Sequence, residues 1–314
     1  MNNHPISETR YQGDPVGGLA HRLSRAVAFM NQKGGVGKTT TVVNLAHAVC
    51  EAGRSVLVID LDPQAHATLH LGIDPDEAEW SVYDLLLDPP TAGGSERVLR
   101  VRESENGGRL GLVPAVTDQA AAEHELSDEP DRTARLSRFL EGVREEYEFI
   151  FLDCPPSLGL LTLNALAAAK EVVIPMQAHF LALQGVGKLL ETVSLVSQGV
   201  NDRLRVSGVV LCMHDEQTRH AREVVDDLKG FFEASRTQDV PWRGARVYDP
   251  PVRRNIKLAE APSFGQPVFE YAKWCPGAQD YRAVGKAVIE EWDAMLERRA
   301  STVEAKPASA EPVA

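Results

Sequence analysis

The sequence predicts an α/β protein built on a mainly parallel, twisted sheet with helices on both faces. Three observations support this fold class. Short apolar runs alternate with longer segments of helical periodicity, the apolar runs are continuous, and a glycine-rich turn joins the first run directly to a helix. Continuous apolar strands are typical of a sheet that is buried on both faces. The β-α-β alternation then favours parallel strands joined by crossover helices.

Taken in order, the expected elements form one uninterrupted β-α-β series. The first strand is expected at residues 26–32, the first helix at 38–52 and the second strand, SVLVIDL, at 55–61. Later apolar runs predict strands at residues 109–115, 148–153, 171–176 and 205–212. Helical patterns are found at residues 132–146, 158–169, 183–198, 218–233 and 278–298. The stretch 89–108 is rich in Gly, Pro and charge, so it is expected to be a surface excursion.

The two ends of the chain differ in composition from its middle. Residues 1–25 mix Gly, Pro, Ser and charge without periodicity, which is typical of a flexible arm. Residues 300–314 form a low-complexity tail that is expected to be disordered. We therefore expect a single folded domain at residues 26–299.

Composition excludes several classes of protein. The 314 residues include 33 Lys and Arg against 45 Asp and Glu, a formal net charge of −12, which argues against a surface that is basic all over. No apolar stretch is long enough to span a membrane, and the N-terminus does not resemble a secretory signal. The cysteines, Cys50, Cys154, Cys212 and Cys275, are too far apart to suggest a zinc site or a disulfide framework. A cytoplasmic protein without a membrane partner is expected.

The strongest local pattern is NQKGGVGKTT at residues 31–40. Glycines allow the backbone to fold around an anion, and the N-terminus of the following helix adds a partial positive charge. Lys38 is placed to neutralise phosphates, and the Thr39 hydroxyl is placed to coordinate Mg²⁺. The alternative, a plain glycine turn, does not explain Gly-Lys-Thr-Thr between a strand and a helix. The candidate nucleotide-binding residues are Lys33, Gly34, Gly35, Val36, Gly37, Lys38, Thr39 and Thr40.

Three carboxylates follow apolar strands and are expected beside this loop. Asp60 and Asp62 end the second strand, and Asp153 ends the strand FIFL. In a parallel sheet, ligands bind outside the carboxyl ends of the strands, so these acids should meet the phosphates. Adjacent carboxylates would repel a triphosphate unless a cation or water lies between them. An N-capping role remains an alternative for Asp60 or Asp62 taken singly. Cys154, next to Asp153, is expected to be a small buried residue.

The loop departs from the usual phosphate-loop pattern, which requires Gly where this chain has Gln32, and it adds Lys33. Lys-Gly-Gly-Val-Gly-Lys-Thr-Thr resembles the deviant Walker A motif of the ParA/MinD family of P-loop ATPases. The resemblance implies a single P-loop NTPase domain with ATP and Mg²⁺ as cofactors. It implies catalytic roles for Lys33, Lys38 and Asp62: Lys33 reaches the partner's nucleotide in an ATP-sandwich homodimer, and Asp62 positions the attacking water. Metal binding falls on Thr39, Asp153 and, as a further contributor, Asp60.

Further segments resemble the ParA/Soj branch over roughly residues 26–298, among them CPPSLGL after Asp153 and NIKLAEAPSFG near the C-terminus. This branch implies an ATPase that segregates chromosome or plasmid DNA, binds double-stranded DNA non-specifically, is stimulated by a ParB-like partner and associates with the nucleoid. Gln217 stands where relatives have an arginine. Residues 236–257 carry six basic and two acidic residues, or +4. The candidate DNA-binding residues are Arg219, Arg222, Arg253, Arg254 and Lys257.

Two alternatives stay open. A ParA-like ATPase could position a protein cargo on DNA instead of segregating the DNA itself. A MinD-like ATPase would act on a membrane surface, but the last predicted helix is largely acidic on its polar side, which disfavours an anionic membrane. Kinase activity is disfavoured, because no pocket for a second substrate is recognisable.

Overall fold

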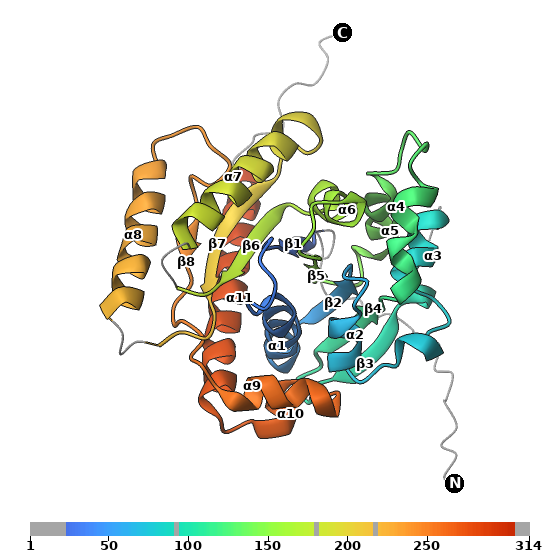
Figure 1. The fold of residues 1–314 in the computed structure, drawn as a ribbon, viewed down its shortest axis with the longest axis horizontal. Coiled ribbons are helices and arrows are strands. Elements are labelled where there is room, and N and C mark those ends of the chain that lie inside the picture. The colour runs from blue at the N-terminus through green and yellow to red at the C-terminus, as the bar shows by residue number, and fades with distance from the viewer. Residues whose placement is uncertain (1–22, 91–93, 179–181, 216–218, 305–314) are drawn as a thin grey trace.

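A computed structural model of the chain describes residues 23–90, 94–178, 182–215 and 219–304 (Figure 1). The expected flexible arm up to residue 22, the tail from residue 305 and Gln217 lie outside the described residues. Arg25 already belongs to the first strand, and the last helix continues to Glu304, so the described secondary structure extends beyond the expected limits 26–299 at both ends.

Eight strands form one sheet in the order β3-β4-β2-β5-β1-β6-β7-β8. Six of them, β1, β2, β4, β5, β6 and β7, lie at the apolar runs that predicted strands, whereas β3 and β8 were not expected. Every neighbouring pair is parallel except β3 and β4, which are antiparallel. The described strands are β1 (Arg25–Phe29), β2 (Ser55–Asp60), β3 (Leu99–Glu103), β4 (Arg109–Val113), β5 (Phe149–Asp153), β6 (Glu171–Met176), β7 (Arg205–Leu211) and β8 (Arg246–Val247). The stretch expected to be a surface excursion thus contributes the edge strand β3.

Helices cover both faces of the sheet, and each face has its own hydrophobic core. In β1, Ala26 and Ala28 belong to one core, whereas Val27 and Phe29 belong to the other. In Figure 1, α8 lies at one end of the molecule and α3, α4 and α5 lie at the other. The described helices are α1 (Lys38–Glu51), α2 (His66–His70), α3 (Val82–Leu87), α4 (Ala122–Glu125), α5 (Arg135–Val143), α6 (Leu160–Ala168), α7 (Ala182–Gly199), α8 (Arg219–Ser235), α9 (Ile256–Glu260), α10 (Val268–Ala272) and α11 (Pro276–Glu304).

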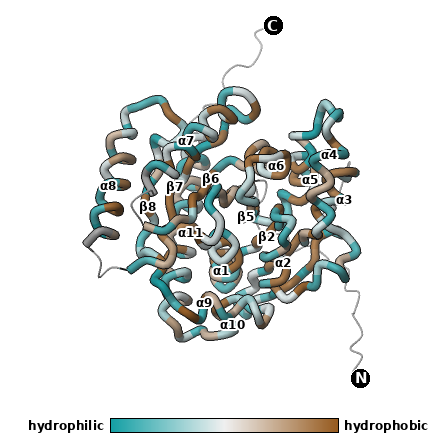
Figure 2. The backbone as a smooth tube through the Cα atoms, in the orientation of Figure 1, coloured by the Kyte–Doolittle hydropathy of each residue, from teal (hydrophilic) through white to brown (hydrophobic). Residues whose placement is uncertain are grey.

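The outer helices are amphipathic. Along α8, hydrophilic and hydrophobic segments alternate in Figure 2, and the buried residues Ala221, Val224, Leu228 and Phe232 recur at helical spacing. Helix α11 buries Tyr281, Val284, Val288 and Trp292 in the core that also contains the apolar face of α1. No helix in the described part of the chain is both long enough and apolar enough to cross a bilayer.

Strand register brings the predicted carboxylates together. Asp60 at the end of β2 is the register partner of Asp153 at the end of β5, and Phe29 at the end of β1 is also opposite Asp153. Neighbouring strands lie about 4.8 Å apart, so the two acids sit side by side at the edge of the sheet from which the glycine-rich loop leaves β1.

Candidate functional site

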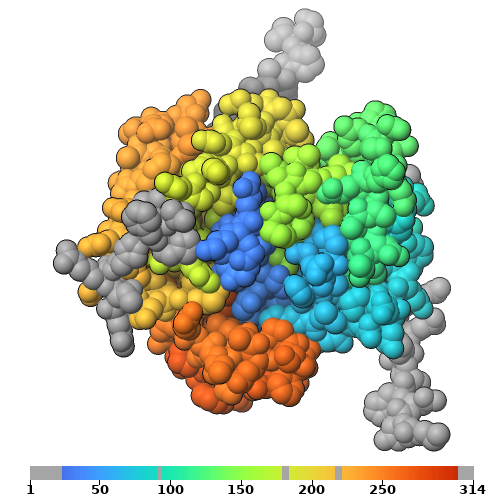
Figure 3. Space-filling model, viewed as in Figure 1, coloured from blue at the N-terminus to red at the C-terminus, as the bar shows by residue number. Residues whose placement is uncertain are grey.

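The loop between β1 and α1 has the backbone of an anion cradle. Gly35 and Gly37 have φ angles of 70° and 97°, a region that favours glycine. A β-carbon on Gly37 would lie only 3.1 Å from the Cys212 side chain. No side chain caps the N-terminus of α1, which begins at Lys38, so its first N–H groups are available to a ligand. In the space-filling view, the loop lies within the blue segment at the centre of one face (Figure 3).

The two lysines of the loop occupy different environments. Lys38 is buried, and its Nζ lies 3.4 Å from the backbone oxygen of Lys33, so it crosses the concave side of the loop. The Lys33 side chain is exposed, while its backbone N–H donates to Asn31 Oδ1 at 3.0 Å. The Asn31 amide in turn donates to the Pro175 oxygen at 2.8 Å, which ties the loop to the end of β6.

Asp153 is a fully buried carboxylate whose two oxygens have no hydrogen-bond partner among the described residues. Burial, followed by the negative charge of Asp60, raises the pKa of Asp153 well above its usual value. Thr39 and Lys38 act in the opposite direction on this pKa, although the Thr39 hydroxyl is outside hydrogen-bonding geometry. An unpartnered buried carboxylate beside a phosphate loop is the arrangement that a bound cation would satisfy.

Asp60 is also fully buried, but its oxygens already have partners. Its Oδ2 accepts from the backbone N–H and the hydroxyl of Thr68, at 2.9 and 2.8 Å, and its Oδ1 accepts from the Asp62 N–H at 3.2 Å. The Thr68 hydroxyl also accepts from the Ala115 N–H at 2.9 Å. These bonds favour a positioning role for Asp60, which fixes the segment from Asp62 to α2, over the predicted metal contact.

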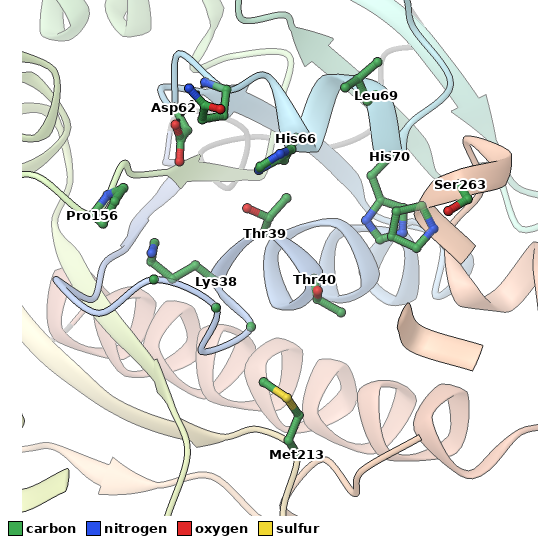
Figure 4. A pocket seen from close by; sticks show the side chains of 15 residues that line it. Lys38, Thr39, Thr40, Asp62, His66, Leu69, His70, Pro156, Met213 and Ser263 are labelled. Atoms are coloured by element: carbon green, nitrogen blue, oxygen red, sulfur yellow. Dashed lines mark hydrogen bonds between the residues drawn. The ribbon is translucent and has the colours of Figure 1, made fainter. Parts of the chain in front are cut away.

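Asp62 lies at the margin between core and pocket, with 9% of its surface exposed. Its Oδ1 accepts from the Gln64 N–H at 3.0 Å, and its carboxylate lines the cavity above the loop. Figure 4 shows Lys38, Thr39 and Asp62 around the same cavity. The structure therefore brings the predicted residues after β1 and β2 to one cavity, with Asp153 of β5 beside Asp60 at the ends of the neighbouring strands.

The cavity has a volume of about 610 Å³, and a second cavity of about 380 Å³ adjoins it through Gly37, Thr40 and Met213. Several residues of the larger cavity were not predicted as site residues: some follow a predicted carboxylate or lie in a segment that resembles the family, but nothing in the pattern assigned them to the cavity, and others come from segments far from the loop in the sequence. Met213 has a positive φ of 50°, which is uncommon for a residue other than glycine. Burial lowers the pKa of His70 to about 4. The missed residues are Gln64, His66, Leu69, His70, Pro156, Met213, Pro262 and Ser263.

The residues present suit a magnesium ion that is held together with a nucleotide. The described residues contain no cluster of three His, Cys, Asp or Glu that would bind a metal alone. Thr39 and the unpartnered Asp153 instead offer two sites of oxygen coordination next to the loop, and phosphate oxygens and water would complete the shell. Cys154, which is fully buried with a raised thiol pKa due to burial, is the inert residue that the sequence predicted.

Comparison with known proteins identifies the family. Residues 24–206 match the AAA domain family. The sporulation initiation inhibitor protein Soj of Bacillus subtilis is 40% identical over 266 residues, which cover 85% of this chain and 98% of that protein. The chain belongs to the ParA/Soj family of P-loop ATPases. The chromosome partitioning protein ParA of Myxococcus xanthus is 40% identical over 269 residues, 85% of this chain and 89% of that protein.

A solved structure of cobyrinic acid a,c-diamide synthase from Mycobacterium smegmatis, with bound ATP analog and magnesium, has a TM-score of 0.69 to this ParA/Soj-family chain. The two are 35% identical, and the match covers 86% of this chain and 96% of the other. The likeness confirms the expected fold class. One fold supports several functions, so the function of this family member depends on the residues of its own site.

Four of the five candidate DNA-binding residues of this ParA/Soj-family chain fall into two groups, and the side chain of the fifth, Arg219, lies outside the described part of the chain. Arg253 binds Asp280, whose side chain is almost fully buried, at 2.6 Å, and Lys257 binds Glu260 at 2.7 Å. Arg222 and Arg254 are exposed and form no ion pair among the described residues. Arg219 is the first residue of α8. The structure does not bring all five together as equivalent surface cations.

The charge of +4 counted along residues 236–257 is partly neutralised in the folded protein by acids from other segments. Arg236 pairs with Glu233 at 2.5 Å, and Arg246 pairs with Glu291 at 3.1 Å. With the partners of Arg253 and Lys257, four of the six basic residues meet a carboxylate from outside the window. The sum along the sequence could not include these acids, because they lie on α8, α9 and α11.

Proposed function

We propose that this chain is a Mg²⁺-dependent ATPase that dimerises with ATP, binds double-stranded DNA non-specifically and is stimulated by a ParB-like partner to segregate chromosome or plasmid DNA. The observation that carries the proposal is the unpartnered Asp153 carboxylate beside the phosphate loop. A buried, ionised carboxylate that accepts no hydrogen bond destabilises the folded protein, unless a bound cation compensates its charge. The similarity to chromosome partitioning proteins supports the biological part of the proposal.

The two adjoining cavities fit the two ends of a nucleotide. The triphosphate would occupy the larger cavity, where the glycine backbone and Lys38 meet it. The base would enter the smaller one, whose lining includes the apolar side chains of Val252, Ile256 and Leu258. Apolar walls with a few polar groups are typical of sites for planar ligands.

Each step of ATP hydrolysis can be assigned to a residue of this site. Asp62 would orient a water for in-line attack on the γ-phosphorus, while Lys38 and the N-terminus of α1 stabilise the negative charge that passes to the leaving ADP. Thr39 and Asp153 would hold Mg²⁺, which supplies further charge neutralisation at the phosphates. Asp60 would keep Asp62 in place through the hydrogen bond to its N–H. The products are ADP and inorganic phosphate.

The different burial of the two lysines supports separate roles. Lys38 is buried behind its own loop, where it reaches only phosphates in its own pocket. The Lys33 side chain is exposed at the surface of the same face, where it could reach a nucleotide held by a second copy of the chain. A sandwich dimer closed over the phosphates would use both lysines.

Light scattering after gel filtration, with ATP, ADP or no nucleotide, tests this proposal. We expect dimers with ATP only, loss of nucleotide binding in Lys38→Ala, and retained nucleotide binding without dimerisation in Lys33→Ala. Unchanged ATP-dependent dimerisation in both variants would refute the assigned roles. DNA binding under the same three conditions then tests the next step, and binding that does not depend on ATP would contradict it.

Helix α11 weakens the membrane-surface alternative. An amphipathic helix that binds a bilayer must present its apolar face outward. Here Val288 and Trp292 of α11 lie in the same core as α1. Co-sedimentation with anionic liposomes in the presence of ATP distinguishes the two functions, since the proposed DNA-binding ATPase should stay in the supernatant.

A further inference from the structure

A third cavity lies at the opposite edge of the sheet from the nucleotide site. It has a volume of about 400 Å³, and Lys170, Arg203, Arg205 and Arg243 contribute to its wall. These residues flank the amino ends of β6, β7 and β8, whereas the phosphate loop follows the carboxyl end of β1, which is parallel to β6. Strand β6 has six residues, so the two sites are roughly 17 Å apart along the sheet.

Two carboxylates also line this cavity, but cations on its inner side already neutralise them. Glu171 accepts hydrogen bonds from two nitrogens of the buried Arg25, at 3.0 and 2.7 Å. Glu291 accepts from Arg25 at 2.8 Å and forms an ion pair with Arg246 at 3.1 Å. The acids of the wall therefore do not balance the four basic side chains that face the cavity.

The four basic side chains themselves form no ion pair among the described residues. Burial first, and then the charges of Arg144 and Arg299, lower the pKa of Lys170; Glu171 acts in the opposite direction but does not outweigh them, and Arg203 lowers the pKa further. Two more arginines thus lie beside the cluster. The Arg144 Nε is buried and has no hydrogen-bond partner in the described part of the chain. Like charges have thus collected at one place in a chain whose net charge is −12.

Such a cluster is electrostatically unfavourable on its own, and oxyanions are the ligands that relieve it. Guanidinium groups present several N–H donors in a plane, which matches phosphate oxygens. The volume lies in the range of small-molecule sites. A concave pocket also encloses separate phosphate groups better than it accommodates the convex surface of a duplex.

We propose that this cavity binds a small ligand with two or more phosphate groups. Two phosphate groups carry about −1.5 to −2 charges each at pH 7, which balances the four basic side chains of the wall. Both an inorganic oligophosphate and a nucleoside bisphosphate have this chemistry. The site is independent of the nucleotide pocket and makes no use of its residues.

Calorimetric titration with inorganic tripolyphosphate tests the proposal. All proteins carry Lys38→Ala, which weakens phosphate binding at the nucleotide loop. We expect Arg203→Gln combined with Arg205→Gln to lower the affinity for tripolyphosphate at least tenfold. The matched control, Arg100→Gln with Lys286→Gln, removes the same charge from exposed side chains elsewhere and should leave the affinity within twofold. No measurable binding, or equal binding in both double variants, would overturn the proposal.

Two further arms define the ligand. Titration with adenosine 3′,5′-bisphosphate tells whether a base adds affinity, and dependence of either compound on the two arginines supports the site. A 24-base-pair duplex is titrated in parallel. If the two arginines matter for the duplex and not for either small ligand, the cluster is a nucleic-acid contact and the proposal is wrong. Circular dichroism confirms that both double variants are folded.

Discussion

Three carboxylates of the nucleotide site occupy neighbouring positions and differ mainly in their hydrogen bonds. Asp60 accepts three hydrogen bonds, Asp62 accepts one at the rim of the cavity, and Asp153 accepts none among the described residues. The same side chain therefore has three different settings: Asp60 is bonded to the backbone and hydroxyl of neighbouring residues, Asp62 faces the cavity, and Asp153 is buried without a hydrogen-bond partner among the described residues. Hydrogen bonds, more than sequence position, distinguish the three carboxylates, and the roles proposed for them follow from this difference.

Because Asp153 has no hydrogen-bond partner among the described residues, replacing it is expected to raise the stability of the protein and to lower its ATPase activity. The folded pKa of Asp153 is raised above its usual value, so its contribution to stability is complete at pH values below about 4 and is lost as the pH rises toward the folded pKa. Without nucleotide at pH 7.5, Asp153→Asn should be more stable than the parent, and the difference should shrink toward pH 4. ATP hydrolysis should fall at least about 100-fold.

Urea unfolding at several pH values and a phosphate-release assay measure the two effects of Asp153→Asn. Asp227→Asn, an exposed substitution on α8, is the matched control and should change stability by less than about 0.5 kcal/mol. Lower stability of Asp153→Asn at neutral pH would show that the carboxylate has a partner in solution. Normal ATP hydrolysis by this variant would contradict the metal-binding role proposed for Asp153.

Thr68 illustrates the opposite case, a buried hydroxyl that has every partner it needs. It donates to Asp60 and accepts from the Ala115 N–H, which joins α2 to the segment after β4. Thr68→Val keeps the shape of the side chain and leaves a buried N–H without an acceptor, so it should lower the free energy of unfolding by about 1–3 kcal/mol. Thr302→Val, on the exposed end of α11, is the control. Equal midpoints in urea for the two variants would contradict the role given to Thr68.

Some residues of the site could be predicted from sequence and others could not, for a physical reason. Continuous apolar strands precede Lys38, Asp62 and Asp153. The sequence pattern that predicts each strand therefore also predicts the site residue after it. Met213, which follows the carboxyl end of β7, and Ser263, in the segment after α9, line the cavity although both are far from the loop in the sequence. In the same way, the acid that pairs with Arg253 lies on α11, far along the chain.

At the scale of elements, the strands that could be predicted from the sequence are those that are buried along almost their whole length, because their residues form a continuous apolar run. Strands β5 and β6 are almost fully buried and have the expected bounds to within a residue. Strand β3 is half exposed at the edge of the sheet and follows a stretch rich in Gly and Pro, so its pattern resembles a loop. Strand β8 has only two residues and depends on pairing with β7 rather than on its own sequence.

Close packing of α11 on α1 makes one glycine sensitive to substitution. A β-carbon on Gly285 would lie 2.9 Å from the Ala48 β-carbon, closer than real contacts allow. Gly285→Ala should therefore destabilise the protein by about 1–3 kcal/mol despite the better helix propensity of alanine. Gly230 on α8 has open space instead, so Gly230→Ala should stabilise by up to about 1 kcal/mol. Thermal unfolding of the two variants should shift in opposite directions, and a shift in the same direction would contradict the packing argument.

At the scale of the whole molecule, the surface charge depends on which cations form ion pairs with acids, and the overall composition does not show this. The net charge of −12 coexists with cations that have no acidic partner among the described residues, near Arg254 on one side and around Lys170 at the amino edge of the sheet. The nucleotide site occupies the carboxyl edge. An acidic body with small basic regions favours DNA binding that needs two copies of the chain, because one region alone holds too few cations.

This distribution predicts which arginines carry DNA binding by the ATP-bound protein. Arg222 and Arg254 are exposed without an ion pair among the described residues. Arg222→Gln or Arg254→Gln should therefore weaken DNA binding. Each should also reduce the slope of the logarithm of the DNA-binding constant against the logarithm of salt concentration by about one for each DNA phosphate that is no longer neutralised. Arg253→Gln is the matched comparison: its partner Asp280 would lose a buried ion pair, and stability should fall by about 1–2 kcal/mol. Fluorescence anisotropy across a salt series, with urea unfolding of each variant, separates the two effects. If Arg253→Gln changes the salt slope while Arg254→Gln does not, the assignment of free and paired arginines is wrong.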